Sequence, residues 1–246
     1  MKRYITTLLM VCTVSLYAEK KEIMVSAAAS LSGAFHEIGQ SFEKKHGIKV
    51  LFNFGPTNSL LQQIEKGAPA DVFASADQEW METGIKKGLI LAESKKDFVR
   101  NTLVIIAPAS STLKIKSLKD IKQPAIKKIC AVQQNSPAGK YAREVLTREG
   151  LTDVFQKKNI PADNVKQAVD YVSREEVDIA FVYKTDAAFA KNKVKVLFTA
   201  GGHKPILYPV AIVKESKKIN ESKLFIDFIL SKEGRSILSK HGFDKP

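Results

Sequence analysis

The chain has 246 residues, of which 44% are hydrophobic and 26% charged, and its formal net charge is +13. This composition is typical of a globular protein, and the length allows one large domain or two of ordinary size. The basic residues are scattered in short pairs such as Lys44–Lys45 and Lys217–Lys218, without an aromatic RNA-binding motif, zinc-finger spacing or a helix-turn-helix pattern. We therefore expect no nucleic-acid partner and interpret the charge as solubility and long-range attraction of anions.

The first 18 residues have the pattern of a cleaved signal peptide. Lys2 and Arg3 precede an apolar stretch over residues 5–16 that is too short to span a bilayer, and Ala18 offers a small residue for cleavage. The pattern predicts export and a periplasmic mature protein.

The cysteines bear on anchoring and on stability. Cys12 follows Val11, which is a poor match to a lipidation motif, so lipoprotein anchoring is the lesser alternative. After cleavage only Cys130 is left, and it cannot form an internal disulfide. The mature protein must therefore gain its stability from an apolar core.

Apolar runs alternate with amphipathic segments along the mature chain, an order that favours mixed, mainly parallel sheets flanked by helices in an α/β fold. Strands are expected at 23–25, 48–54, 71–74, 103–108, 129–132, 178–183 and 207–213. Helical spacing of apolar residues predicts helices at 31–47, around 60–64 and 80–85, from 136, at 164–174 and at 221–241.

No linker rich in proline, glycine or serine divides the chain, yet so many βα units would not easily form one sheet. We expect two α/β lobes, the first formed by 19–102 with 206–246 and the second by 103–205, with crossovers near Leu103 and Leu207. Ligands of open α/β sheets bind at the carboxyl ends of strands, so the cleft between the lobes is the expected site.

Several strand-to-helix junctions carry small and polar residues. Ser30 follows three alanines at an expected helix N-cap, and Thr57 lies in a turn that begins with Gly55. Ala138 follows a proline at a helix start and leaves its N–H free, and Tyr183 ends a strand, where its phenol faces either a cleft or the core. Each is explained singly by ordinary capping or packing, but their recurrence points to an anion site.

As a set, these segments resemble the periplasmic molybdate-binding proteins of ABC transporters, which are type II periplasmic binding proteins. The resemblance covers essentially the whole mature sequence and rests on AAASL at 27–31, GPTNSL at 55–60, GAPADVFASAD at 67–77 with WM at 80–81, SPAGKYA at 136–142 and VDIAFVYKTDA at 177–187.

The resemblance implies a two-lobed monomer that binds molybdate or tungstate between its lobes, needs no cofactor and delivers the ligand to a membrane permease. It assigns ligand contacts to the hydroxyls of Ser30, Thr57 and Tyr183 and to the backbone N–H groups of Ala138 and Val165. Thr57 stands where the family often has serine, and its extra methyl group bears on pocket size.

Such a set suits the chemistry of molybdate, an unprotonated tetrahedral dianion whose oxygens only accept hydrogen bonds. Hydrogen phosphate carries a proton that would find no acceptor in a cage of donors. Sulfate has the right charge, so its smaller size must exclude it, whereas tungstate is too similar in size for the sequence to separate the two.

Two other functions stay open. A binding protein for another oxyanion such as sulfate has the same fold, and an exported enzyme is the weaker alternative. The motifs G-x-S-x-G, G-x-x-x-x-G-K-[ST], G-x-G-x-x-G and H-E-x-x-H are missing from the sequence. His36, His46, His203 and His241 lack metal-ligand spacing, and Cys130 lies in an apolar strand, so we expect neither a metal centre nor a nucleophile.

Overall fold

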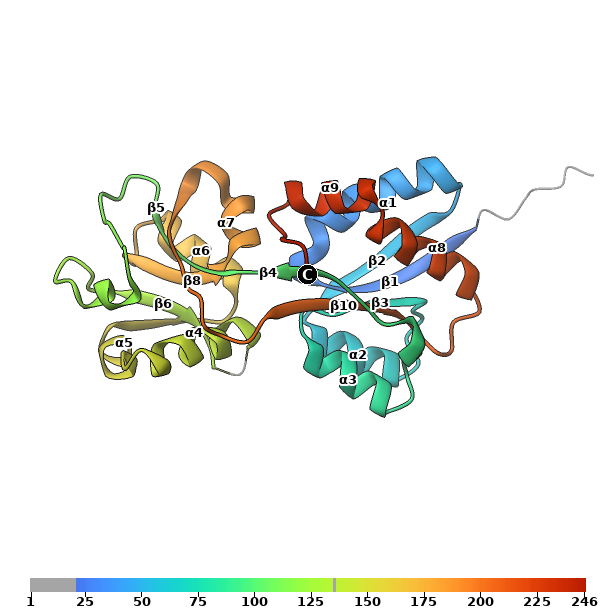
Figure 1. The fold of residues 1–246 in the computed structure, drawn as a ribbon, viewed down its shortest axis with the longest axis horizontal. Helices are drawn as coiled ribbons and strands as arrows, with labels where there is room; N and C mark the ends of the chain where they lie inside the picture. Colours follow the sequence, from blue (N-terminus) through green and yellow to red (C-terminus); the bar gives the residue numbers. More distant parts are fainter. Residues whose placement is uncertain (1–20, 135) are drawn as a thin grey trace, which may run out of the picture.

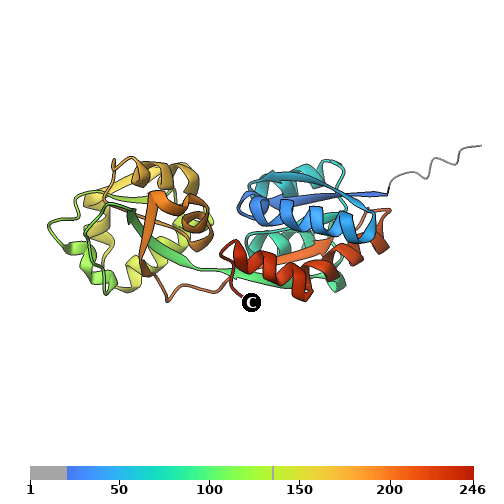
Figure 2. The ribbon, with the colours of Figure 1, turned by 90° about the horizontal axis from the view of Figure 1, so that it is seen from above.

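The structure is a computed structural model that describes residues 21–134 and 136–246. The expected signal peptide over 1–18, with Cys12, lies outside the described residues. Two lobes lie side by side and are joined by two crossing segments (Figures 1 and 2). In the described part of the chain, no helix combines the length and the apolar character needed to cross a membrane.

The first lobe is built on a five-stranded sheet, counted within the described residues, with the order β2-β1-β3-β10-β4. Its strands are β1 (Glu22–Ala28), β2 (Lys49–Gly55), β3 (Val72–Ala74), β4 (Lys96–Asn101) and β10 (Ile206–Ile212). β1 pairs in parallel with β2 and β3, whereas β10 runs antiparallel to β3 and β4. The carboxyl ends of β1 and β2 therefore meet at one edge of the sheet.

Helices cover both faces of this sheet (Figure 1). On one face lie α1 (Ser32–His46), α8 (Ile219–Leu230) and α9 (Lys232–Lys240), and on the other lie α2 (Thr57–Glu65) and α3 (Gln78–Lys86). Short 3-10 turns are η1 (Ala29–Leu31) and η2 (Ala92–Ser94). The layers bury the apolar side of each amphipathic helix, which is the main source of stability in such folds.

The second lobe repeats the plan. Within the described residues its sheet has the order β7-β6-β8-β5-β9. The strands are β5 (Leu103–Pro108), β6 (Ile129–Val132), β7 (Asn159–Ala162), β8 (Ile179–Tyr183) and β9 (Val194–Thr199). The helices are α4 (Pro137–Arg148), α5 (Thr152–Lys158), α6 (Val165–Ser173) and α7 (Lys184–Ala190), with the 3-10 turns η3 (Leu118–Lys122) and η4 (Lys191–Lys193). β6 is parallel to β7 and β8, and β5 is antiparallel to β8 and β9.

Both sheets are mixed and flanked by helices, which confirms the expected α/β fold. Within the described residues each sheet has as many antiparallel as parallel strand pairs, so the sheets are not mainly parallel as expected. The antiparallel pairs involve β4, β5, β9 and β10, the strands on either side of the two crossings. The strand order puts those crossings between Asn101 and Leu103 and between Thr199 and Ile206. The lobe limits expected from the sequence, 19–102 with 206–246 and 103–205, stay a prediction.

The helical spacing over 221–241 is divided between two helices, α8 and α9. The chain breaks at Ser231, whose side chain accepts a hydrogen bond from the N–H of Gly234 and so caps a new helix, α9. A second hydrogen bond, from the Ser231 hydroxyl to the Phe228 carbonyl, closes the end of α8. The serine therefore separates two helices that share one apolar pattern.

The apolar core is continuous between the lobes. A single cluster of buried residues contains Ala28, Leu31 and Tyr208 of the first lobe together with Ala138 and Tyr183 of the second. The cluster therefore spans the boundary, and the lobes are in contact: the Asn101 side chain of the first lobe donates a hydrogen bond to Thr185 of the second.

Candidate ligand-binding site

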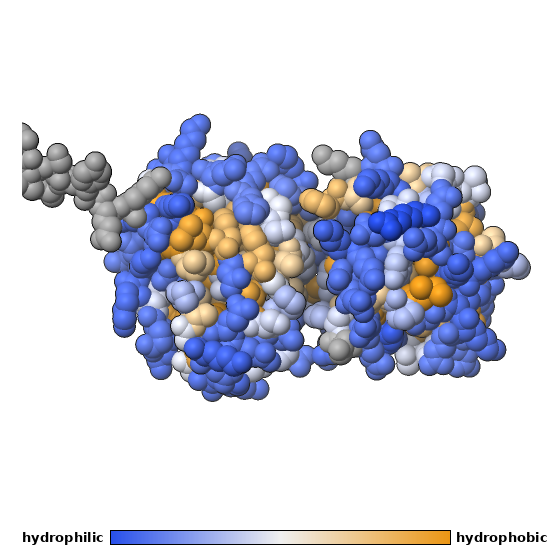
Figure 3. All heavy atoms as spheres, turned by 180° about the vertical axis from the view of Figure 1, so that it is seen from behind, coloured by the Kyte–Doolittle hydropathy of each residue, from blue (hydrophilic) through white to orange (hydrophobic). Residues whose placement is uncertain are grey.

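The site is framed by strand ends from both sheets. Since β6, β7 and β8 are parallel, their carboxyl ends share one edge of the second sheet, as those of β1 and β2 do in the first. Most of these strands lead directly into a helix or a 3-10 turn, and a furrow separates the two lobes on the face drawn in Figure 3. First turns of helices expose backbone N–H groups that have no intrahelical partner.

Ser30 follows the end of β1, but it does not cap a helix as the sequence predicts. It lies inside the 3-10 turn η1, and Leu31 holds the N-cap position of α1 without a side-chain hydrogen bond. The small residues before Ser30 let the chain tighten into a 3-10 turn, which moves the serine away from the cap. Its hydroxyl lies 3.2 Å from the hydroxyl of Tyr208 instead.

Thr57 is the first residue of α2 and is buried. Its Oγ1 accepts a hydrogen bond of 3.2 Å from the backbone N–H of Ala76. A hydroxyl that already accepts from the protein has its own hydrogen left to donate. Thr57 is thereby prepared to donate to an acceptor such as an oxyanion.

Ala138 is the second residue of α4, after Pro137, which has no N–H. The side chain of Ser136 accepts from the N–H of Gly139 at 3.1 Å, and the Ser136 carbonyl accepts from the N–H of Lys140. Helix geometry leaves the Ala138 N–H without an intrahelical partner. The buried methyl group of Ala138 packs in the shared core, which fixes the position of that donor.

Val165 is the first residue of α6 and is half-buried. Asn164 caps this helix: its Oδ1 accepts a 3.0 Å hydrogen bond from the N–H of Gln167. The cap takes the Gln167 donor, and the Val165 N–H at the first helical position again lacks an intrahelical partner. Its side chain packs against the cluster that contains Ala138 and Tyr183.

Tyr183 ends β8 and is 5% exposed. Its hydroxyl is buried and has no hydrogen-bond partner among the residues that the structure describes. Burial raises the pKa of this phenol well above its usual range, and the nearby Tyr208, Tyr141, Asp186 and Asp77 add to the rise. An unpartnered buried hydroxyl costs about 1–3 kcal/mol, so this hydroxyl is suited to donate to an acceptor on a ligand.

Asp77 is a residue of this region that the sequence analysis did not single out. Its Oδ1 caps α3 by accepting from the N–H of Trp80 at 2.8 Å. Its Oδ2 is buried and unpartnered among the described residues, and burial raises the pKa of the carboxyl. The capping pattern SADQEW is visible in the sequence, but the closeness to Tyr183 depends on the contact between lobes.

The structure thus brings Ser30, Ala138 and Tyr183 to one continuous region, with Val165 at its edge, and places Thr57 beside Ala76, which packs on the same core. These residues offer hydroxyls and backbone N–H groups and no cationic side chain. Within the described residues, no cluster of His, Cys, Asp or Glu has the arrangement of a metal-cation site. The arrangement is suited to hold an acceptor-only anion.

A hollow of about 570 Å³ lies elsewhere, between α1 and α9. Charged and polar side chains line it, among them Glu37, Lys45 and Glu233. It is shallow and open, and the buried hydroxyls at the strand ends lie outside it, so we do not assign the ligand site there.

Comparison with known proteins identifies relatives over nearly the whole chain. The family model of bacterial extracellular solute-binding proteins matches residues 23–244. The molybdate-binding protein ModA of Escherichia coli K12 is 36% identical over 232 residues, which cover 92% of this chain and 90% of the relative. A putative ABC transporter substrate-binding lipoprotein of Bacillus subtilis, YvgL, is 34% identical over 92% of this chain and 88% of the relative.

Solved structures agree. The substrate-binding domain of a putative molybdenum ABC transporter from Clostridium difficile superposes with a TM-score of 0.82 at 38% identity, and covers 92% of this chain and 99% of that chain. The sulfate-binding protein SubI of Mycobacterium tuberculosis has a TM-score of 0.78 at 15% identity over 92% of this chain and 87% of that chain, which shows a common fold alone. The chain belongs to the family of bacterial extracellular solute-binding proteins.

Proposed function

We propose that the protein binds molybdate, and also tungstate, outside the cytoplasm and delivers it to the membrane permease of an ABC transporter. The observation that carries this proposal is the Tyr183 hydroxyl, which is buried without a hydrogen-bond partner among the described residues, in the same cluster as Ala138 from the first turn of α4. The relatives named ModA, at 33–36% identity, support molybdate as the ligand. We propose Ser30, Thr57, Ala138, Val165 and Tyr183 as its contacts.

The energetics favour a neutral cage of donors. A hydrogen bond to a charged partner contributes about 1.5–3 kcal/mol, so a cage of several such donors supplies on the order of 10 kcal/mol before dianion desolvation is subtracted. The Tyr183 hydroxyl adds to the free energy of binding, because it has no hydrogen-bond partner among the described residues and gains one from the ligand. Tight binding therefore needs no lysine or arginine in the cage.

The same set of hydrogen-bond donors supports selectivity for deprotonated over protonated oxyanions. Thr57 Oγ1 uses one lone pair to accept from the N–H of Ala76, and its hydrogen is left to donate to the ligand. A protonated oxyanion such as hydrogen phosphate would place its own hydrogen against these donors. We propose a periplasmic monomer that takes fully deprotonated tetrahedral dianions.

The first test is isothermal titration of the mature chain, stripped of bound ligand, with molybdate, tungstate, sulfate and phosphate. We expect tight 1:1 binding of molybdate and tungstate only. Sulfate binding without molybdate binding would replace the substrate, and no binding of any of the four would overturn the proposal.

The second test concerns the residues. Ser30→Ala should weaken molybdate binding about tenfold, since one hydrogen bond to a charged ligand is lost. Thr57→Ser should keep the affinity within about threefold, whereas Thr57→Ala should lose about tenfold or more. Ser173→Ala, at the exposed far end of α6, is the matched control and should bind as the unaltered protein does. Unchanged affinity in both Ser30→Ala and Thr57→Ala would overturn the assignment of these contacts.

A further inference from the structure

A chain of buried hydrogen bonds leads to the Ser30 hydroxyl from the crossing between the lobes. The Asn101 side-chain nitrogen Nδ2 donates to the Tyr208 hydroxyl at 3.1 Å, and that hydroxyl lies 3.2 Å from Ser30 Oγ. The same Nδ2 donates to Thr185 Oγ1, on the second lobe, at 2.9 Å. Asn101, Thr185 and Tyr208 are all buried, so water does not compete for the two bonds that Asn101 donates.

The orientation of the Asn101 amide is fixed by its other end. The backbone N–H of Thr102 donates to Asn101 Oδ1 at 2.9 Å, and only the carbonyl oxygen of the amide can accept that bond. The remaining atom is therefore the NH₂ group, whose two hydrogens match the two acceptors, Thr185 Oγ1 and Tyr208 Oη. Asn101 is satisfied in this orientation and in no other.

The direction of the next bond follows. The Tyr208 hydroxyl accepts from Asn101, and its own hydrogen is left for Ser30 Oγ. Burial keeps the pKa of Tyr208 far above its usual value, so the hydroxyl keeps that hydrogen at any working pH. Ser30 Oγ then acts as an acceptor toward Tyr208, and its one hydrogen points to a different partner.

We propose that Asn101 and Tyr208 are positioning residues that make the Ser30 hydroxyl an obligate donor to the oxyanion, and thereby set selectivity against protonated oxyanions. The inference rests on the proposed function and adds to it the residues that orient one contact. In a series of hydrogen bonds each bond polarises the next, so the bonds from Asn101 and Tyr208 strengthen the bond that Ser30 donates to the ligand. The two residues act through Ser30 and need no contact with the ligand.

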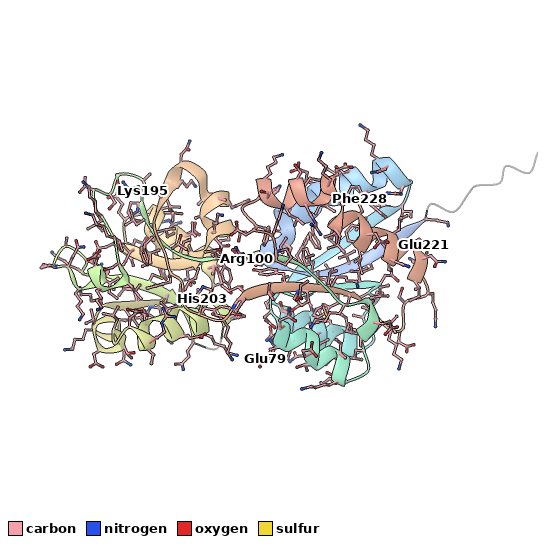
Figure 4. The ribbon with its side chains drawn as sticks, in the orientation of Figure 1. Glu79, Arg100, Lys195, His203, Glu221 and Phe228 are labelled. Carbon is pink, nitrogen blue, oxygen red and sulfur yellow. The ribbon has the colours of Figure 1, made fainter. Side chains whose placement is uncertain are left out.

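We call the hydrogen-bonded series Asn101–Tyr208–Ser30 the relay. The position of Asn101 in the fold also connects this relay to the second lobe. Asn101 is the last residue of β4, directly before the crossing into the second lobe, and Figure 4 shows its neighbour Arg100 near the boundary between the lobes. Through Thr185 the relay is also tied to α7, the helix that follows Tyr183. The Asn101 amide thus links Ser30, a proposed ligand contact of the first lobe, to the segment of the second lobe that carries Tyr183, another proposed contact.

A double-mutant cycle tests whether Tyr208 acts through Ser30. Tyr208→Phe removes the hydroxyl and keeps the ring, which packs against Phe243 with centroids 5.5 Å apart. It should weaken molybdate binding about fivefold in the unaltered protein and leave the affinity of the Ser30→Ala variant nearly unchanged. Equal losses in both backgrounds would overturn the relay.

The selectivity between phosphate and molybdate should change only if Tyr208 orients Ser30, and not if Tyr208 has a structural role alone. Without Tyr208 as donor, Ser30 Oγ is free to accept the hydrogen of hydrogen phosphate. The ratio of the phosphate Kd to the molybdate Kd, measured at about pH 7, should therefore fall about tenfold or more in Tyr208→Phe. A ratio equal to that of the unaltered protein would overturn the proposal, since general damage weakens both ligands alike.

Asn101→Asp tests the first step, because a carboxylate turns the Tyr208 hydrogen away from Ser30. It should reproduce the fall in the Kd ratio, and an unchanged ratio would remove Asn101 from the relay; if this variant does not fold, the Tyr208 cycle decides. Tyr171→Phe is the control: its hydroxyl accepts from Gln167 Nε2 at 3.0 Å on α6, and its loss should change neither Kd nor ratio. Absence of molybdate binding in the unaltered protein would instead overturn the proposed function.

Discussion

Lys140 of α4 and Glu79 of α3 form an ion pair between the two lobes, with Nζ 3.3 Å from Oε2. Figure 4 shows Glu79 at the lower end of the boundary between the lobes, and both side chains are well exposed. Exposed ion pairs contribute little, about 0–1 kcal/mol, and salt screens them. The pair therefore adds a small, salt-sensitive preference for the arrangement in which the lobes touch.

Removal of either partner should weaken molybdate binding about twofold at low ionic strength, and the effect should disappear in about 0.5 M salt. Glu79→Gln and Lys140→Gln should change the affinity in the same direction, because each breaks the same contact. Long-range attraction of the anion predicts opposite signs, so titrations of both variants separate the two causes. Lys87→Gln, which breaks a pair with Glu65 inside the first lobe, is the control.

Tyr183→Phe should weaken molybdate binding without lowering the stability of the ligand-free protein. The hydroxyl is buried without a partner among the described residues, so its removal should leave the ligand-free protein as stable as before or more stable by about 1 kcal/mol. The affinity for molybdate should fall about tenfold or more. Thermal unfolding with and without molybdate measures both; a loss of stability in the ligand-free variant would contradict this account of the site.

Gly139→Ala should disturb the start of α4. A Cβ at this position would lie 2.1 Å from the Gln133 carbonyl oxygen and 2.6 Å from that of Val132, and backbone atoms cannot move aside easily. We expect a loss of about 1–3 kcal/mol in unfolding free energy and at least tenfold weaker molybdate binding, because Ala138 N–H is displaced. Gly201→Ala, where no atom lies within 4 Å of the added Cβ, should be close to neutral in urea denaturation and titration.

The contribution of Asp186 to the free energy of unfolding should decrease as the pH rises. Burial raises its pKa from 3.8 to about 7, although its Oδ2 accepts from the N–H of Tyr183. Because the folded state binds the proton more tightly than the unfolded state, this contribution is greatest below about pH 4 and is lost by about pH 7. The side chain is partly exposed, so the amplitude is on the order of 2 kcal/mol. Urea denaturation at about pH 5 and pH 8 should show a smaller difference for Asp186→Asn than for the unaltered protein.

The exposed Asp227→Asn on α8 is the matched control for this pH dependence. It should keep the pH difference of the unaltered protein. The same pH difference in Asp186→Asn and in the unaltered protein would show that another group is responsible.

The elements that the sequence predicted are those with a strong local signal. Continuous apolar runs gave β5, β6 and β8, and helical spacing gave α1 and α6. The strands that were missed, β4, β7 and β9, have partly exposed patterns, and β7 contains Pro161, which is tolerated at the edge of a sheet. Their strand conformation depends on a neighbour supplied by a distant part of the chain.

The sequence by itself determined where donors are found: small residues, a proline and capping side chains at strand-to-helix junctions, because capping depends on residues only a few positions apart. Only the tertiary structure decided what those donors face. Ser30 and Tyr208 are 178 positions apart, and the Tyr183 hydroxyl is buried without a hydrogen-bond partner among the described residues. The direction of a hydroxyl hydrogen is set by its neighbours in space, which no local pattern contains.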